Sequence, residues 1–151
     1  MNEANRISNK TRLYGYIAAD AGQNRFSAAL NRLFRASGDD AMMIPMNIRE
    51  DDFYFTLSNM KKSHVNGAVI GAEYQKEAVG ILDVPSPLVQ ENGFCDIVTV
   101  REGRLYGDII APSLLRQCHD ENGSEYVVYE AIQLNIVQEA YNFIKEIHES
   151  T

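Results

Sequence analysis

Basic residues are scarce in this chain, which has 14 Lys and Arg against 21 Asp and Glu and a formal net charge of −7. Because nucleic-acid binding needs a basic face against the phosphates, this charge argues against a nucleic-acid partner. No apolar run approaches the roughly 20 residues of a membrane-spanning helix. The polar N-terminus, Met-Asn-Glu-Ala-Asn-Arg, does not resemble a signal peptide. We therefore expect a cytoplasmic protein with no membrane partner.

Metal ligands and phosphate-binding loops are also scarce. Cys95 and Cys118 have no Cys-x-x-Cys spacing, and the histidines, His64, His119 and His148, are scattered along the chain. Two reduced thiols and no zinc site are the expectation. The motif Gly-x-Gly-x-x-Gly is absent, so the 151 residues hold no recognisable cradle for dinucleotide phosphates. The sequence therefore predicts no metal and no bound cofactor.

The length and composition indicate one globular domain. The chain has 151 residues, of which 45% are hydrophobic and 23% charged, and this is enough to bury a sizeable core. Residues 1–11 are polar, and we expect them to form an N-terminal arm. Residues 12–151 are expected to form a single domain.

The first half of the chain alternates between strand and helix patterns. In the segment 25–36, apolar residues recur at helical spacing, and Ser37-Gly38 ends the run. Short apolar runs bounded by turn residues are typical of buried strands. The expected strands are 12–18, 41–46 and 67–70, and the expected helices are 25–36, 51–62 and 74–82. This alternation favours a mostly parallel sheet with helices on both faces.

The second half departs from this alternation. Residues 96–101 and 104–107 flank Glu102-Gly103, a pattern that predicts a two-residue hairpin. A short helical turn is expected over 112–117. Residues 124–149 carry a broad apolar stripe and predict one long helix. The expected fold is a three-layer α/β/α domain, with a mostly parallel sheet, an antiparallel edge hairpin, and the C-terminal helix packed on it.

The stretch from Gly67 to Gly107 resembles the substrate-binding domain of shikimate dehydrogenase. Three motifs carry the resemblance: Lys76-Glu-Ala-Val79, Asp83-Val-Pro-Ser86, and the run from Gly93-Phe-Cys-Asp96 to Arg104-Leu-Tyr-Gly107. The resemblance extends over about residues 12–111. It implies a family fold of two domains, an N-terminal α/β substrate domain and a Rossmann domain that binds NADP.

The resemblance also implies a set of site residues. Lys76 stands in the place of the family's proton-transfer lysine, near the start of a helix. Asp96 takes the place of a substrate-binding Asn. The remaining positions that correspond to substrate contacts are Asn24, Arg25 and Ser27 at the carboxylate clamp, Asn31 on the following helix, and Glu130, which stands in place of a Gln.

Several positions depart from the family pattern. Ile70 and Ala72 occupy the places of an Asn and a Thr that bind substrate hydroxyls. Ala111 stands where the family has its catalytic Asp. With Asp96 in place of Asn, a carboxylate replaces a neutral amide, which makes a poor neighbour for an anionic substrate. The departures predict a weakened or lost oxidation step.

Three functions follow from this combination. The first is a cofactor-less, stand-alone relative of the substrate domain, a pseudoenzyme that binds a small hydroxy-carboxylate without oxidising it. The second is a shikimate or quinate dehydrogenase whose NADP-binding Rossmann domain comes from a separate chain. The third is an interaction or regulatory module with a degenerate cleft. A face exposed by the missing domain would also favour a homodimer.

Overall fold

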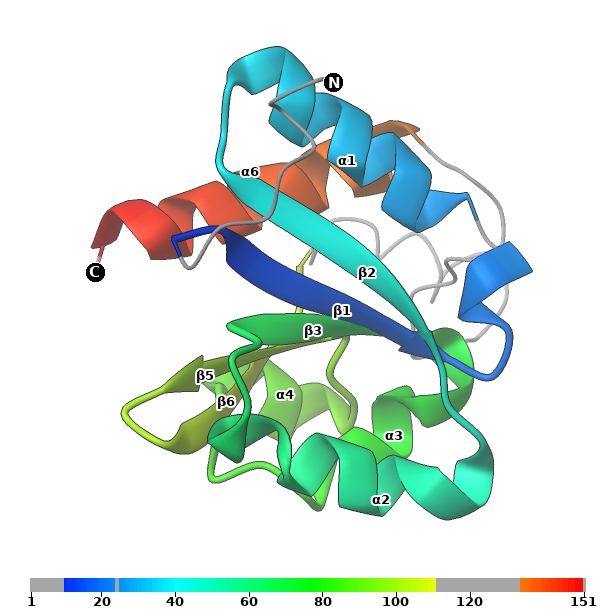
Figure 1. Ribbon diagram of the computed structural model, residues 1–151. Coiled ribbons are helices and arrows are strands. Elements are labelled where there is room, and N and C mark those ends of the chain that lie inside the picture. Colours follow the sequence, from blue (N-terminus) through cyan, green and yellow to red (C-terminus); the bar gives the residue numbers. More distant parts are fainter. Residues whose placement is uncertain (1–9, 24, 111–133, 151) are drawn as a thin grey trace.

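The computed structural model describes residues 10–23, 25–110 and 134–150. Its centre is a six-stranded sheet of order β2-β1-β3-β5-β6-β4 (Figure 1). The strands are β1 (Arg12–Ala18), β2 (Ala41–Asn47), β3 (Gly67–Ile70), β4 (Val84–Pro85), β5 (Ile97–Arg101) and β6 (Arg104–Asp108). Strand β1 pairs in parallel with β2 and β3, and β4 pairs in parallel with β6. Strand β5 is antiparallel to both of its neighbours, β3 and β6. The sheet is therefore mixed with a parallel majority, as predicted.

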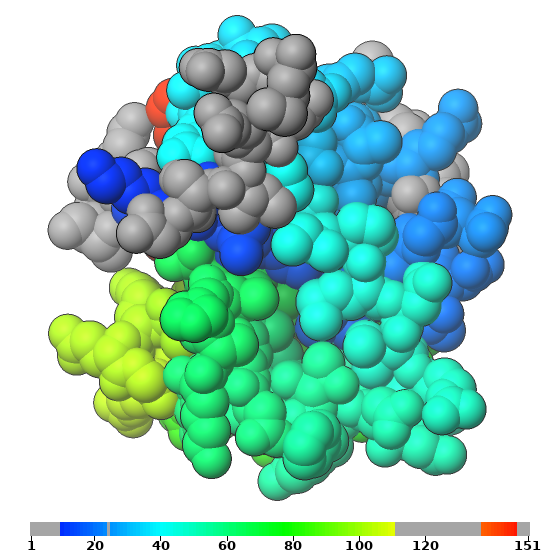
Figure 2. Space-filling model, viewed as in Figure 1, coloured from blue at the N-terminus to red at the C-terminus, as the bar shows by residue number. Residues whose placement is uncertain are grey.

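The predicted hairpin is formed by β5 and β6. Its turn residues Glu102 and Gly103 have φ values of 52° and 72°. Positive φ at both central residues is the signature of the type I′ turn, whose twist suits two-residue hairpins. The turn projects from the body of the molecule (Figure 2).

The hairpin is not the last element of the sheet, because the short strand β4 pairs with β6 on its outer side. The hairpin was predicted to form the edge of the sheet. In the structure β4 occupies that edge, and the hairpin lies one strand further in. Strand β4 has no signal in the sequence, since two residues are too few for an alternating pattern. Helix α4 (Pro87–Asn92) was likewise not predicted, although Ser86 caps it by accepting from the Val89 N–H and Pro87 occupies its first turn.

Helices cover both faces of the sheet, so the domain has three layers. Helices α1 (Phe26–Ser37) and α6 (Leu134–Ser150) lie on one face. Helices α2 (Glu50–Ser58), α3 (Gln75–Val79) and α4 lie on the other (Figure 1). Short 3₁₀ turns, η2 (Ala21–Gln23), η3 (Met60–Lys62) and η4 (Ala72–Tyr74), connect several of these elements. The three-layer prediction is confirmed.

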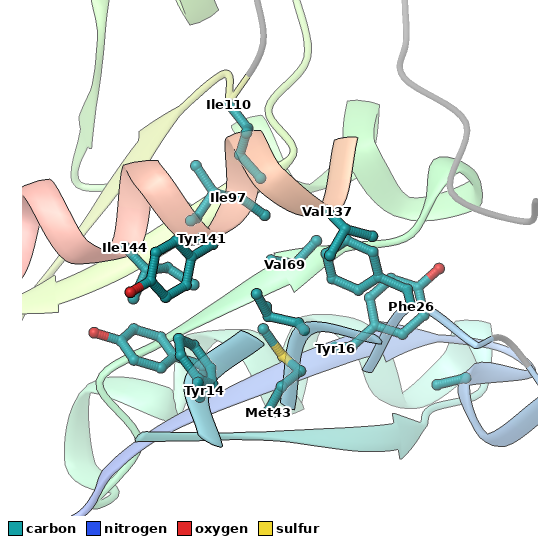
Figure 3. Close-up of a cluster of buried hydrophobic side chains, with 14 of the residues drawn as sticks. Tyr14, Tyr16, Phe26, Met43, Val69, Ile97, Ile110, Val137, Tyr141 and Ile144 are labelled. Carbon is teal, nitrogen blue, oxygen red and sulfur yellow. The ribbon is translucent and has the colours of Figure 1, made fainter. Parts of the chain in front are cut away.

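The core divides into two apolar clusters, one on each face of the sheet. Tyr14 and Tyr16 of β1 face α1 and α6 (Figure 3), whereas Ile17 faces α2. This alternation follows from the period of two in a strand. Phe26, Leu30 and Phe34 of α1 complete the first cluster, and their spacing is the helical one seen in the sequence.

The predicted C-terminal helix is present from Leu134 onward and packs on the sheet. Its buried side chains, Val137, Ala140, Tyr141 and Ile144, follow the spacing i, i+3, i+4 and i+7 (Figure 3). The predicted helix residues 124–133, the helical turn 112–117 and most of the N-terminal arm lie outside the described residues.

Candidate functional site

Four of the predicted site residues, Arg25, Ser27, Lys76 and Asp96, lie on segments that enter or leave the sheet at one edge. Strands β1, β2, β3 and β6 end there, and β5 begins there because it runs antiparallel. In open α/β sheets, ligands bind outside the carboxyl ends of the strands, where the strand order changes direction. Here that point lies between β1 and β3, since β2 is placed on one side of β1 and β3 on the other.

The gap between these two strand ends is closed by tight packing. The Gly71 N–H donates to the Ile17 carbonyl at 2.7 Å, and a Cβ on Gly71 would lie 2.8 Å from the Ala18 Cβ. The Glu73 carboxylate accepts from the Ala19 N–H at 3.0 Å and thereby fixes the chain that leaves β1. Glu73 is exposed, so its carboxylate also faces solvent at this edge. The sequence gives no sign of this role of Glu73, because its partner is a backbone group 54 residues away.

The start of α1 supplies donors at the same edge. Arg25 occupies the N-cap position, is exposed, and makes no side-chain cap. The first N–H groups of a helix have no intrahelical partner and carry partial positive charge. An anion placed here would be stabilised by these groups. The predicted residue Asn24 lies outside the described residues.

Ser27 is the most unusual residue of this region. It is only 4% exposed, and its Oγ has no hydrogen-bond partner in the structure. A buried hydroxyl without a partner costs about 1–3 kcal/mol. No other buried side-chain polar atom among the described residues is left in this state. Ser27 therefore holds an unused donor and acceptor in the first turn of α1.

Lys76 and Asp96 lie on neighbouring segments but in different surroundings. The Cys95 N–H donates to the Gln75 carbonyl at 3.1 Å, which joins the residues just before Asp96 and Lys76. Lys76 is exposed on α3, while Asp96, immediately before β5, is fully buried. The predicted approach of the two side chains to one ligand stays a prediction.

Asp96 connects three parts of the sheet. Its Oδ1 accepts from the Ile110 N–H at 2.8 Å, and its carbonyl accepts from the Ile70 N–H at 2.8 Å. Its own N–H donates to the Asp108 carbonyl. Burial, followed by the charges of Asp96 and Asp108, raises the pKa of the Cys95 thiol far above its usual range. Cys95 is thereby kept protonated and unreactive.

Asn31 has a structural role. Its Nδ2 donates to the Met43 carbonyl at 2.9 Å, and its Oδ1 accepts from the Met43 N–H at 2.7 Å. Both ends of the amide are thus used on the edge strand β2, and we do not carry Asn31 into the proposed site. Glu130, the last of the predicted contacts, lies outside the described residues.

A cavity that the sequence did not predict lies between α6 and the outer strands β5, β6 and β4. Its volume is about 260 Å³, and its walls include Ile97, Phe143 and Ile147. Ser86 and Asp108 also line it, and the Ser86 Oγ donates to the Asp108 Oδ1 at 3.0 Å. Lys76 and Asp96 are not among its lining residues.

The described residues contain no group of three or more His, Cys, Asp or Glu side chains that could hold a metal ion. Within the same residues, none of the helices has the length and apolar character needed to cross a membrane.

Comparison with known proteins supports the resemblance to shikimate dehydrogenase. No protein-family model matches the chain. Over 101 residues, 67% of the chain, it is 26% identical to the shikimate dehydrogenase (NADP(+)) of Pyrococcus furiosus, and the match covers 37% of that protein.

Solved structures show the same fold. The shikimate dehydrogenase of Aquifex aeolicus superposes with a TM-score of 0.67 at 21% identity, covering 79% of this chain and 45% of that one. For shikimate dehydrogenase 1 of Peptoclostridium difficile, the TM-score is 0.66 at 17% identity, with 75% and 43% covered. The 5-ketofructose reductase of a Gluconobacter species matches with a TM-score of 0.65 at 18% identity, with 75% and 41% covered. The chain thus spans about two fifths of the length of these relatives, so the likeness concerns one part of them.

Proposed function

We propose that this chain binds a small hydroxy-carboxylate at the carboxyl edge of its sheet and does not oxidise it. The observation that carries the proposal is the buried, unpartnered Ser27 hydroxyl in the first turn of α1. Natural proteins rarely leave such a group unused, and functional sites are where the exceptions occur. A ligand carboxylate at the start of this helix would accept hydrogen bonds from the Ser27 hydroxyl and from the free backbone N–H groups.

Charged side chains near the start of α1 are proposed to bind different parts of the ligand. The Arg25 guanidinium, at the N-cap position, can hold a carboxylate with two parallel hydrogen bonds. Glu73 and Lys76 follow β3 in the chain and lie at the same edge of the sheet. The Glu73 carboxylate offers an acceptor to ligand hydroxyls, and the Lys76 ammonium group offers a donor. An anion bound next to Glu73 would be repelled, so we place the carboxylate at α1 and the hydroxyls toward η4 and α3.

Binding without oxidation is favoured by two sequence features. Ala111 stands where the resembling family has its catalytic Asp, and a methyl group cannot take part in proton transfer. No glycine-rich dinucleotide motif occurs in the 151 residues, and hydride transfer depends on the cofactor. We therefore expect no measurable affinity for NADP.

A thermal-shift titration with shikimate and quinate tests the proposal. A ligand that binds the native state raises the melting temperature by mass action. The uncharged methyl ester of shikimate is the matched control, because it keeps the ring and the hydroxyls but loses the carboxylate. We expect shikimate or quinate to raise the melting temperature and the ester to have no effect. Equal shifts with acid and ester, or no shift with either acid, would contradict the proposed site.

Calorimetry with NADP tests whether the chain also binds the cofactor that oxidation of the ligand would need. The proposal expects no heat of binding for NADP alone or in the presence of shikimate. Saturable NADP binding at micromolar concentration would favour a dehydrogenase instead.

A further inference from the structure

A second cavity lies at the opposite edge of the sheet, where β1 and β2 begin. Its volume is about 180 Å³. It is bounded by the start of both strands, the C-terminal end of α1 and the middle of α6. Because parallel strands begin at one edge and end at the other, this cavity is separate from the site at the carboxyl edge.

The floor of the cavity is apolar and aromatic. Phe34 of α1 and Tyr141 of α6 are both buried, with ring centroids 5.8 Å apart. Ile144, one helical turn after Tyr141, and Ala41 at the start of β2 complete the floor. A cavity of about 150 Å³ can hold a benzene molecule. The volume here therefore suits one aromatic ring.

Among the described residues that line the rim of the cavity, positive charges outnumber negative ones. These residues are Lys10, Arg12 and Lys145 against Asp39 and Asp40, which sum to one net positive charge. The whole chain carries a formal charge of −7. A locally positive cavity on an acidic protein is the kind of place where an anion would be attracted.

Both carboxylates of the rim already have donors. Asp39 accepts from the Tyr141 hydroxyl at 2.6 Å, and Lys145 Nζ lies 3.5 Å from its other oxygen. Asp40 accepts from the Thr11 hydroxyl at 2.8 Å. These bonds fix the carboxylates and satisfy part of their negative charge, so that they oppose an incoming anion less than free carboxylates would.

Arg12 retains donors for a ligand. Its interaction is with Tyr14, whose hydroxyl lies on the same side of the core as that of Tyr141 (Figure 3). A guanidinium has five N–H donors, so a contact with one phenol leaves most of them available. Their planar arrangement fits a carboxylate in particular.

We propose that the cavity at the amino edge binds a small aromatic carboxylate, with the ring between Phe34, Tyr141 and Ile144 and the carboxylate on Arg12. The ring replaces water on the apolar floor, and the carboxylate adds the hydrogen bonds that fix its orientation. Neutral ring compounds would gain only the first of these contributions, and aliphatic acids such as acetate only the second.

Benzoate is the probe for this site. Titration of the ¹⁵N-labelled full chain should give saturable amide shifts that cluster at 10–12, 39–41 and 141–145. Benzyl alcohol, benzylamine and acetate, the matched probes, should bind at least about tenfold more weakly, the lower end expected for losing a hydrogen bond to a charged group. Shifts spread over the surface, or equal binding of benzylamine, would overturn the assignment.

Two variants test the site by different means. Arg12→Gln removes the charge and should weaken benzoate binding about tenfold or more, whereas Ala41→Leu fills the floor and should abolish it. Lys62→Gln, which removes one exposed positive charge from η3 on the other face, is the matched control and should bind like the wild type. Unfolding of each variant by denaturant identifies any that fails to fold. Unaltered benzoate affinity in both folded variants, or in Ala41→Leu if Arg12→Gln does not fold, would refute the proposal.

Because shikimate has no aromatic ring and the proposed carboxyl-edge site lies at the other end of the strands, the two proposals fail independently. Loss of benzoate binding in Ala41→Leu with shikimate binding retained would support both. Shikimate binding lost in Ala41→Leu would place shikimate in this cavity and contradict the separation of the two sites.

Discussion

Asn31 on α1 and Met43 on β2 exchange two hydrogen bonds, one in each direction, at 2.9 and 2.7 Å. Strand β2 is an edge strand, and the N–H and C=O of Met43 face away from β1. Unpaired groups on such an edge would be open to pairing with another chain. The amide of Asn31 therefore closes the edge at the same time as it fixes α1 against the sheet.

Replacing Asn31 by Ala should destabilise the domain by about 2 kcal/mol, because two backbone groups that are partly buried lose their partner. Asn142→Ala removes an exposed amide that bonds only to a neighbouring side chain on α6, and it is the matched control. Urea unfolding measures both variants. If Asn31→Ala is no less stable than Asn142→Ala, the two hydrogen bonds between Asn31 and Met43 do not contribute to the free energy of unfolding.

The stability contributed by Asp83 should depend on pH. Its Oδ2 accepts from the Leu105 N–H at 2.8 Å, and this bond lowers the pKa of the carboxyl group, with a smaller contribution from Lys61. A group whose pKa is lower in the folded state stabilises it above the unfolded pKa, near 3.9, and loses that effect as the pH falls through the folded value. We expect Asp83→Asn to be less stable than the wild type at pH 7.

Urea unfolding of the two proteins from pH 7 down to pH 2 measures the difference. The gap should be constant above about pH 5 and close as the pH falls through the acid range. The matched control is Glu139→Gln, which removes an exposed carboxylate from the middle of α6, away from either helix end. A gap for Asp83→Asn that persists at the lowest pH would show that the substitution acts through packing and not through charge.

Sequence patterns were sufficient for most of the fold. The bounds predicted for β1 and β3 agree with the structure, because each is a short apolar run buried on both faces. The turn at Glu102-Gly103 was predicted from the residues that tolerate its backbone angles. Both features are local, so their signal lies within a few residues of the chain.

The rest depends on contacts between distant segments. Strand β4 exists because Val84 and Pro85 meet Tyr106 and Gly107, and no pattern in two residues encodes that. Asn31 was predicted from the resemblance as a substrate contact, and the two bonds of its amide to the Met43 backbone become visible only in the structure. The missing partner of Ser27 likewise becomes visible only when the surroundings of the hydroxyl are known.

Gly71 should not accept a side chain. Its φ of −63° suits any residue, so the objection is steric: a Cβ would lie 2.8 Å from the Ala18 Cβ and 3.1 Å from the Ile17 carbonyl oxygen. Neither atom is the end of a flexible chain. Gly71→Ala should therefore push β1 and β3 apart and cost about 1–3 kcal/mol.

Gly80→Ala is the matched control for this substitution. Gly80 has a φ of −69°, and a Cβ there would meet only the Glu77 carbonyl oxygen, at 3.8 Å. Alanine should be neutral or stabilise by up to about 1 kcal/mol through the unfolded state. Thermal unfolding compares the two variants, and a Gly71→Ala protein as stable as Gly80→Ala would mean that the strand ends are not in close contact.

Ser27→Ala should separate stability from binding. Removing a buried hydroxyl that has no partner relieves its desolvation cost, so the ligand-free protein should become more stable by about 1 kcal/mol. The same change should weaken shikimate or quinate binding about tenfold, because the ligand carboxylate loses one charge-assisted hydrogen bond. A purely structural serine would not produce opposite signs in the two measurements.

Ser37→Ala, at the exposed C-terminal end of the same helix, is the control for ligand affinity and should leave it unchanged. Thermal unfolding without ligand and calorimetric titration with ligand supply the two readouts for each variant. If Ser27→Ala lowers the stability of the free protein, the hydroxyl has a structural partner and is not held in reserve for a ligand carboxylate. If it raises stability but leaves affinity unchanged, the ligand binds away from the start of α1.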